Sequence, residues 1–197
     1  GQQGLDCCRA EAQKAAQVLN IPDSAVLVAS TGVIGKQIPV DRITAGIELL
    51  ASDKASGAEA SLAAAKAIMT TDTVPKQVAV KVEIGGKEVT IGGMCKGSGM
   101  IHPNMCTMLG FVTTDVNISK ELLTKAVKAS VEDSFNMISV DGDTSTNDTL
   151  LVMANGLAGN AEITEEGADF DTFCQALNEI TITLAKKMAG DGEGATA

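Results

Sequence analysis

The chain is organised around the stretch Met94-Cys-Lys-Gly-Ser-Gly-Met-Ile-His-Pro-Asn-Met-Cys-Thr-Met-Leu-Gly-Phe-Val-Thr-Thr-Asp115. It places one cation, Lys96, before a Gly-Ser-Gly segment, continues through a Pro103-Asn104 turn, and puts Thr107 at the start of an apolar run. Glycine allows backbone conformations that other residues avoid, so this segment predicts a flexible hinge followed by a strand. Thr107 is a candidate nucleophile. From the local pattern alone, a threonine that simply forms the strand is the simpler interpretation, because β-branched residues favour strands.

Periodic apolar patterns on both sides of this stretch predict alternating helices and strands. Spacings of three and four predict helices over residues 6–19, 41–50, 58–69, 119–131 and 171–188, with Asp6 and Ser119 as N-caps. Alternating or short apolar runs predict strands over residues 25–29, 77–84, 87–91, 109–114 and 135–140, and residues 150–154 form a further apolar run. Gly85-Gly86 predicts a hairpin turn. The mixture predicts an α+β or α/β layered fold.

Composition and charge exclude several classes of function. The 197 residues are 45% hydrophobic, which is enough for a sizeable core, and with only 4 Phe and no Trp or Tyr that core must be built from aliphatic side chains. A net charge of −10 opposes binding to nucleic acid or anionic lipid. We find no apolar run long enough to span a membrane and no signal-peptide pattern in the first residues, so we expect a cytoplasmic protein.

The sequence predicts neither a disulfide framework nor a metal site. Its 5 cysteines are odd in number and lack the C-x-x-C spacing of zinc sites. The acidic loop 141–148 resembles a calcium loop at its first positions, but Thr146 replaces the required glycine and Val152 replaces the final glutamate. His102 is the only histidine, and the adjacent proline favours a structural role for it.

Three other segments allow either a structural or a functional interpretation. Thr31-Gly32 follows the predicted strand 25–29, and its backbone amides could form an ordinary turn or point at a ligand. Thr70 ends a predicted helix. Glu193 stands in a glycine-rich loop, where a solvated carboxylate is the simple interpretation. For Lys96, the simple interpretation is a lysine on the surface.

A resemblance decides between these interpretations. The segment from Lys96 to Leu109 resembles the self-cleavage segment of the ornithine acetyltransferase family, also called bifunctional glutamate N-acetyltransferase and amino-acid acetyltransferase. Residues 28–35, 67–76, 139–148 and 191–196 resemble further segments of that family in the same order. Family members are longer, so the resemblance covers an internal portion of them. They usually have Ala where this chain has Cys106.

The resemblance implies a self-processing, N-terminal-nucleophile-like enzyme. Its chain would be cleaved between Cys106 and Thr107, giving an α-chain portion, residues 1–106, and a β-chain portion, residues 107–197. A freed α-amino group would then activate the Thr107 hydroxyl. Thr31 and Gly32 inherit the role of oxyanion hole. The implied fold is a layered sandwich in which the two cleaved chains stay intertwined.

The same resemblance implies the substrates and partners. Thr70, Lys96, Thr107 and Glu193 would bind substrate, and an acetyl group would pass from N-acetylornithine to glutamate in arginine biosynthesis. No cofactor is implied, and whether acetyl-coenzyme A also serves as donor is left open by the sequence. The cleaved pairs would assemble two by two as a heterotetramer. The alternatives are an inactive or unprocessed fragment of the family and a related N-terminal-nucleophile aminopeptidase.

Overall fold

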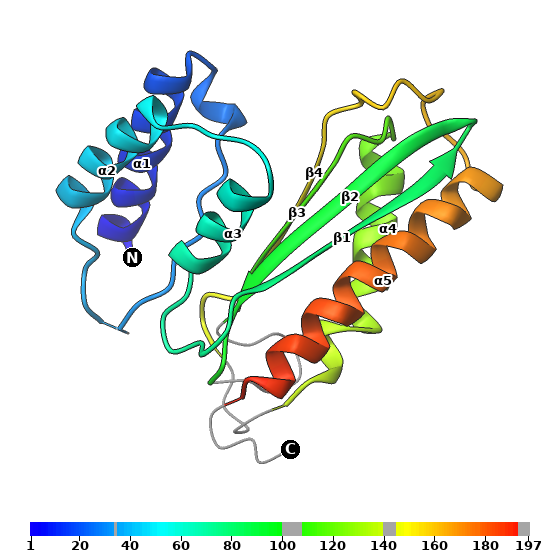
Figure 1. Ribbon diagram of the computed structural model, residues 1–197. Coiled ribbons are helices and arrows are strands. Elements are labelled where there is room, and N and C mark those ends of the chain that lie inside the picture. The colour runs from blue at the N-terminus through cyan, green and yellow to red at the C-terminus, as the bar shows by residue number, and fades with distance from the viewer. Residues whose placement is uncertain (34, 100–107, 140–144, 193–197) are drawn as a thin grey trace. The chain divides into compact units, whose positions relative to one another are not determined.

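The computed structural model describes residues 1–33, 35–99, 108–139 and 145–192 (Figure 1). The chain forms two compact units, Gly1–Ala60 and Ser61–Ala197. The division predicted between residues 106 and 107 concerns cleavage and falls at residues outside the described ranges. Within those ranges, no helix has both the length and the apolar character needed to cross a membrane.

The first unit is helical. Helix α1 spans Gln2–Leu19 and packs against α2, Val40–Ser52, with the short 3-10 helix η1, Asp23–Ala25, between them in the chain. The prediction that Asp6 caps α1 is wrong, because the helix begins one turn earlier, after Gly1. Asp6 instead accepts hydrogen bonds from Gln2 and Arg9 on the helix surface.

The predicted strand at residues 25–29 is also wrong. Residues 26–33 follow η1 without forming a helix or strand. A short apolar run becomes a strand only where a neighbouring strand can pair with its backbone. This run belongs to the helical unit, whereas all four strands found in the described residues lie in the second unit.

The second unit is built on a four-stranded mixed sheet with the order β1-β2-β3-β4. Strands β1, Lys76–Ile84, and β2, Lys87–Lys96, form the predicted hairpin, and Gly85 and Gly86 turn it with φ angles of 56° and 70°. Strand β3, Leu109–Thr114, is antiparallel to β2 and parallel to β4, Thr149–Ala154. The fold is therefore a mixed α+β arrangement, as predicted.

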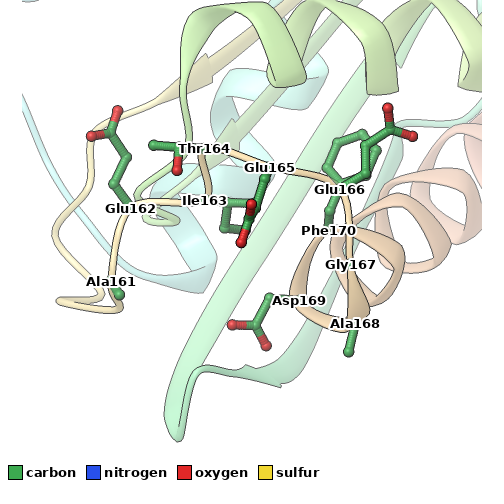
Figure 2. Close-up of a pocket in the computed structure, with 10 residues that line it drawn as sticks. All are labelled: Ala161, Glu162, Ile163, Thr164, Glu165, Glu166, Gly167, Ala168, Asp169 and Phe170. Carbon is green, nitrogen blue, oxygen red and sulfur yellow. The ribbon is translucent and has the colours of Figure 1, made fainter.

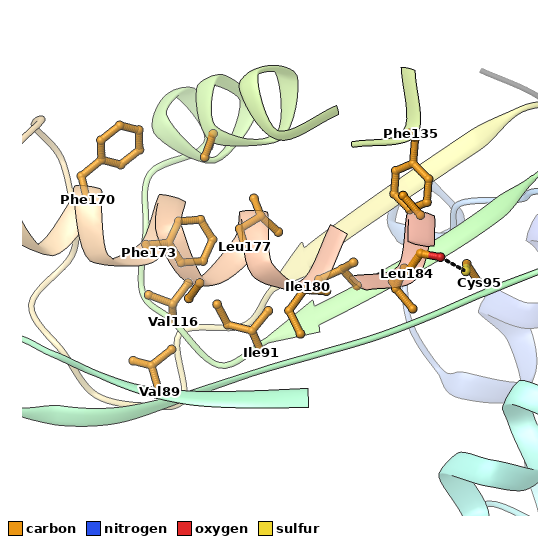
Figure 3. Close-up of a cluster of buried hydrophobic side chains, with 14 of the residues drawn as sticks. Val89, Ile91, Cys95, Val116, Phe135, Phe170, Phe173, Leu177, Ile180 and Leu184 are labelled. Carbon is orange, nitrogen blue, oxygen red and sulfur yellow. Dashed lines mark hydrogen bonds between the residues drawn. The ribbon is translucent and has the colours of Figure 1, made fainter. Parts of the chain in front are cut away.

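Helices supply the second layer. The chain enters this unit through α3, Ala58–Ala67, and after β3 it forms α4, Lys120–Glu132, whose N-terminus is capped by Ser119 as predicted. Helix α5, Ala168–Gly190, packs on β1 and β2 and beside α4. Its side chains Phe173, Leu177, Ile180 and Leu184 are fully buried against the sheet (Figure 3). Burying each such side chain contributes about 1.5–3 kcal/mol of transfer free energy.

Two further predictions need correction. Residues 135–140 do not begin a strand, because Phe135–Met137 form a 3-10 helix, η2, directly after α4. Phe135 is buried in the core, and the Ser134 hydroxyl donates to the carbonyl of Ser130, which keeps this turn close to α4. Strand β2 runs to Lys96 rather than ending at Ile91.

Candidate functional site

Lys96 is the last residue of β2 and lies opposite Leu109, the first residue of β3. The simple interpretation of an exposed lysine is wrong, since Lys96 is only 3% exposed. Its Nζ lies 3.5 Å from the Thr70 hydroxyl, at the long limit of a hydrogen bond. The structure thus brings together two of the residues expected to bind substrate.

Burial lowers the pKa of the Lys96 ammonium, because a charged group loses solvation there. The carboxylates of Asp72 and Asp148 act in the opposite direction and favour the charged form, while the Lys76 charge adds to the lowering. A lysine in this environment gains from an additional anionic partner.

Asp72 connects this lysine to the segment that carries Thr70. Its Oδ1 accepts from the Gly97 backbone N–H at 2.7 Å and from Lys76 Nζ at 2.7 Å, and its Oδ2 accepts from the Thr70 N–H at 3.2 Å. Burial alone would raise the pKa of Asp72, but these hydrogen bonds and the Lys76 charge outweigh it and hold the pKa below its ordinary value. Asp72 is therefore a buried, ionised acceptor.

Lys76, the first residue of β1, is completely buried and bridges two carboxylates. Its Nζ lies 2.7 Å from Asp72 Oδ1 and 2.5 Å from Asp191 Oδ2. Burial opposes the charged form of Lys76, yet hydrogen bonds to Asp191 and Asp72 raise its pKa. Asp191 also accepts from the Thr73 N–H at 2.9 Å and from the Thr73 hydroxyl. Burial would raise the pKa of Asp191, but these partners lower it to about 2.

The predicted hinge after Lys96 is anchored at its start. Gly97 and Ser98 are both buried. The Gly97 N–H donates to Asp72, and the Ser98 and Thr71 hydroxyls are hydrogen-bonded at 2.7 Å. The segment after β2 is thus tied to the segment after α3, which corrects the expectation of a flexible connection at these two residues.

Asp148 lies beside the backbone that directly follows Thr107. The Met108 N–H donates to Asp148 Oδ1 at 3.0 Å, and the Met108 carbonyl accepts from the Thr149 N–H at 3.1 Å. Burial raises the pKa of Asp148, while the Met108 and Ser145 hydrogen bonds and the Lys96 charge oppose that rise. The residue after the expected nucleophile is therefore fixed at the junction of β3 and β4.

The other expected site residues lie either in the first unit or outside the described residues. Thr31 and Gly32 belong to the first unit, where Thr31 is half-buried and Gly32 is exposed. Cys106, Thr107 and Glu193 lie outside the described residues.

Sequence reasoning assigned no role to four carboxylate and ammonium groups, those of Asp72, Lys76, Asp148 and Asp191. One signal was present: a lysine at the start of an alternating strand, four residues after an aspartate and directly after Pro75. That spacing shows only that the two charges are near in sequence. The second carboxylate that contacts Lys76, that of Asp191, is distant in the chain and could not be found from spacing.

A separate surface depression is lined by residues 161–170 (Figure 2). Its carboxylates include two with clear structural partners: Asp169 accepts from the Gly85 N–H at 3.1 Å, and Glu166 pairs with Lys125 at 2.5 Å. Of the expected substrate-binding residues, the two that the structure describes, Thr70 and Lys96, do not line it.

The fold and these contacts define an α+β protein with paired, buried charges at one end of its sheet. The chain belongs to the ArgJ family, whose model matches residues 1–197. This match confirms the family resemblance inferred from the motif segments. The family match rests on the sequence alone, whereas the site geometry rests on the contacts among Thr70, Asp72, Lys76, Lys96, Gly97, Met108, Asp148 and Asp191.

Two relatives, each described as arginine biosynthesis bifunctional protein ArgJ, are similar over the whole chain. The Symbiobacterium thermophilum protein is 55% identical over 196 residues, which cover 100% of this chain and 48% of the relative. The Thermotoga neapolitana protein is 53% identical over 196 residues, covering 100% of this chain and 49% of the relative. The chain thus spans about half the length of the curated relatives it matches.

A solved structure is also similar in sequence. The crystal structure of the arginine biosynthesis bifunctional protein ArgJ from Bacillus halodurans is 52% identical, and the match covers 44% of this chain and 40% of that one with a TM-score of 0.42.

Proposed function

We propose that this chain forms the acetyl-transferring part of an enzyme that moves an acetyl group from N-acetylornithine to glutamate, with acetyl-coenzyme A as a further donor. The observation that supports this most directly is the buried Lys96 beside Thr70, in a chain of the ArgJ family. N-acetylornithine carries a carboxylate and a distal ammonium, and a buried cation is a suitable partner for the first of these.

The first step of the proposal is self-cleavage. The Thr107 hydroxyl attacks the carbonyl carbon of Cys106, and the peptide nitrogen of Thr107 leaves as the acyl group moves to oxygen. Water then hydrolyses the ester, which releases the Cys106 carboxylate and a new chain that begins with Thr107. The freed α-amino group has a reference pKa of about 8 and can accept the proton of its own hydroxyl.

Acetyl transfer then proceeds in two halves. The Thr107 hydroxyl oxygen attacks the acetyl carbonyl carbon while the α-amino group takes the proton. The carbon–nitrogen bond breaks, the proton passes to the leaving nitrogen, and ornithine departs from an acetyl-threonine ester. The α-amine of glutamate attacks that ester, and the restored hydroxyl regains its proton. Thr31 and Gly32 are the proposed donors to the oxyanion formed in each half.

Substrate binding divides between two charges. Lys96 pairs with the substrate carboxylate, Thr70 adds a hydrogen bond, and Glu193 pairs with the distal ammonium of ornithine. The approach of the carboxylate would raise the lowered pKa of Lys96 and so favour its charged form. The chemistry needs no cofactor, because threonine carries the acetyl group. We expect the cleaved chains to remain paired, two pairs to assemble, and the enzyme to act in the cytoplasm.

Intact mass under denaturing conditions tests the cleavage. The full-length gene product should give two chains that meet between Cys106 and Thr107, and its Thr107→Ala variant should give one. A Thr113→Ala variant is the matched control, since this threonine is exposed on β3 and should leave cleavage unchanged. If the unsubstituted gene product also gave a single uncut chain, the alternative of an unprocessed or inactive member of the family would be favoured instead.

Activity assays separate the remaining alternatives. The cleaved protein should transfer labelled acetyl from N-acetylornithine to glutamate, and single-turnover experiments should trap a mass increase on the Thr107 chain. Release of amino acids from peptide substrates, without exchange between ornithine and glutamate, would replace the proposal with an aminopeptidase.

A further inference from the structure

We propose that Asp72, Lys76 and Asp191 form a positioning network that holds Thr70 and Lys96 in place for substrate binding; this role rests on the proposed function. None of the three needs to touch substrate. They act through the backbone of the segments that carry the two substrate-binding residues.

The network joins two parts of the chain that are distant in sequence, because Asp72 and Lys76 are only four residues apart whereas Asp191 follows Lys76 by 115 residues. Asp72 follows α3, Lys76 opens β1 and Asp191 follows α5. Through Asp72 the network also reaches the end of β2, because Asp72 Oδ1 accepts from the Gly97 N–H at 2.7 Å. The ends of three secondary-structure elements and the start of a fourth are thus fixed by two carboxylates and one ammonium group.

Each carboxylate performs two tasks at once. Asp72 binds Lys76 and also accepts hydrogen bonds from the amides of Thr70 and Gly97. Thr70 is a proposed substrate-binding residue, and Gly97 directly follows Lys96. Asp191 binds Lys76 and holds the Thr73 amide at 2.9 Å. The backbone contacts of the network therefore reach one substrate-binding residue, Thr70, and the neighbour of the other, Gly97.

The energetics favour a role in positioning over a role in stability alone. Three buried charges lose much of their solvation, and apolar residues of similar size often stabilise a fold as well as a buried ion pair does. What an apolar residue cannot do is accept the hydrogen bond of the Gly97 backbone amide, which is buried and donates to Asp72. Asp72 meets that need directly beside Lys96 and also accepts from the Thr70 amide.

The hydrogen-bond pattern makes the carboxylates hard to replace. Both oxygens of Asp72 accept, from Gly97, Lys76 and Thr70, so the amide nitrogen of an asparagine there would face a donor whichever way it turned. The same holds for Asp191, whose oxygens accept from Lys76 and Thr73. Asp72→Asn and Asp191→Asn therefore break the network with minimal change in size.

The matched control is the exposed pair Lys81–Glu88. It also links β1 to β2, at 2.6 Å, but its side chains are 64% and 66% exposed. Surface pairs of this kind contribute little, so Glu88→Gln should leave substrate binding unchanged.

The test uses the full-length gene product and combines kinetics with amide hydrogen exchange. We expect Asp72→Asn and Asp191→Asn to raise the KM for N-acetylornithine about tenfold while kcat falls less than about threefold, because ground-state binding is the part affected. Exchange at the Gly97 and Thr70 amides should speed up in Asp72→Asn, and exchange at Thr73 in Asp191→Asn. Glu88→Gln should change neither.

The outcomes separate the positioning role from the proposed function. Unchanged KM values in both variants, alongside faster exchange, would overturn the positioning role and leave a purely structural network. Should Asp72→Asn fail to fold, Asp191→Asn still decides the question. An unmodified protein that transfers no acetyl group refutes the proposed function, and with it the positioning role, whatever the variants show.

Discussion

The most discriminating stability prediction compares two adjacent glycines of β2 that face opposite sides of the sheet. A Cβ added at Gly93 would lie 3.0 Å from both Ile180 Cγ2 and Leu184 Cδ1 and 3.2 Å from Val112 Cγ2. Carbon atoms prefer separations of about 3.5–4.0 Å, so each methyl group would have to retreat by about half an ångström. Ile180, Leu184 and Val112 are fully buried and have little space for such a shift.

We expect Gly93→Ala to destabilise the protein by about 1–2 kcal/mol. Overpacking a core costs about 1–3 kcal/mol, and replacing a strand glycine by alanine recovers about 0.5–1 kcal/mol through the unfolded state. Gly92→Ala should be neutral or stabilising, because its Cβ would meet Ala79 Cβ at an ordinary 3.9 Å.

Urea unfolding followed by far-ultraviolet circular dichroism measures both variants, since the sequence has no Trp or Tyr for fluorescence. With a slope of about 2 kcal/mol per molar urea, the midpoint of Gly93→Ala should fall by about 0.5–1 M. Equal midpoints for the two variants would refute the reasoning, because the packing of α5 on β2 would then not be as tight as the structure has it.

Three further predictions rest on other contacts. Asp191 has its pKa lowered from 3.8 to about 2 in the folded protein, so its contribution to stability is complete above about pH 4 and is lost as the pH falls toward 2. In acid titrations followed by circular dichroism, Asp191→Asn should therefore flatten this part of the stability curve, by up to about 2 kcal/mol; an unchanged curve would contradict the ionised state of Asp191. Ser119→Ala removes the hydroxyl that accepts from the Leu122 N–H and should cost about 1 kcal/mol in urea unfolding. Phe173→Ala should cost about 3–5 kcal/mol, with the 71%-exposed Met137→Ala as a control that costs nothing measurable.

Local patterns predicted the elements whose stability is local. The hairpin followed from Gly85-Gly86 between alternating strands, and both glycines have the positive φ angles that the turn requires. Ser119 was identified as an N-cap for the same reason, since its partner lies three residues away. Residues 25–29 failed because an apolar run does not reveal whether a strand is available to pair with it.

Distant contacts explain what the sequence could not predict about the site. Lys96 looked like a surface lysine, and its burial depends on β3 pairing with β2 and on segments that return from α3. The Lys76–Asp191 pair joins residues 115 positions apart, and no periodicity encodes such a contact. The family resemblance identified Lys96 and Thr70 as members of a site. It gave no indication of the charged groups of Asp72, Lys76 and Asp191 next to them.

The sheet topology explains how the two products of a cut before Thr107 would stay associated. Strands β1 and β2 precede the cut, and β3 and β4 follow it. Yet β3 is hydrogen-bonded to β2 from Leu109 to Thr114, and α5, which follows the cut, packs on β1 and β2. Separating the two products would break that ladder and expose the core formed by Phe173, Leu177 and Ile180. The strand order would therefore keep the two products of such a cut together.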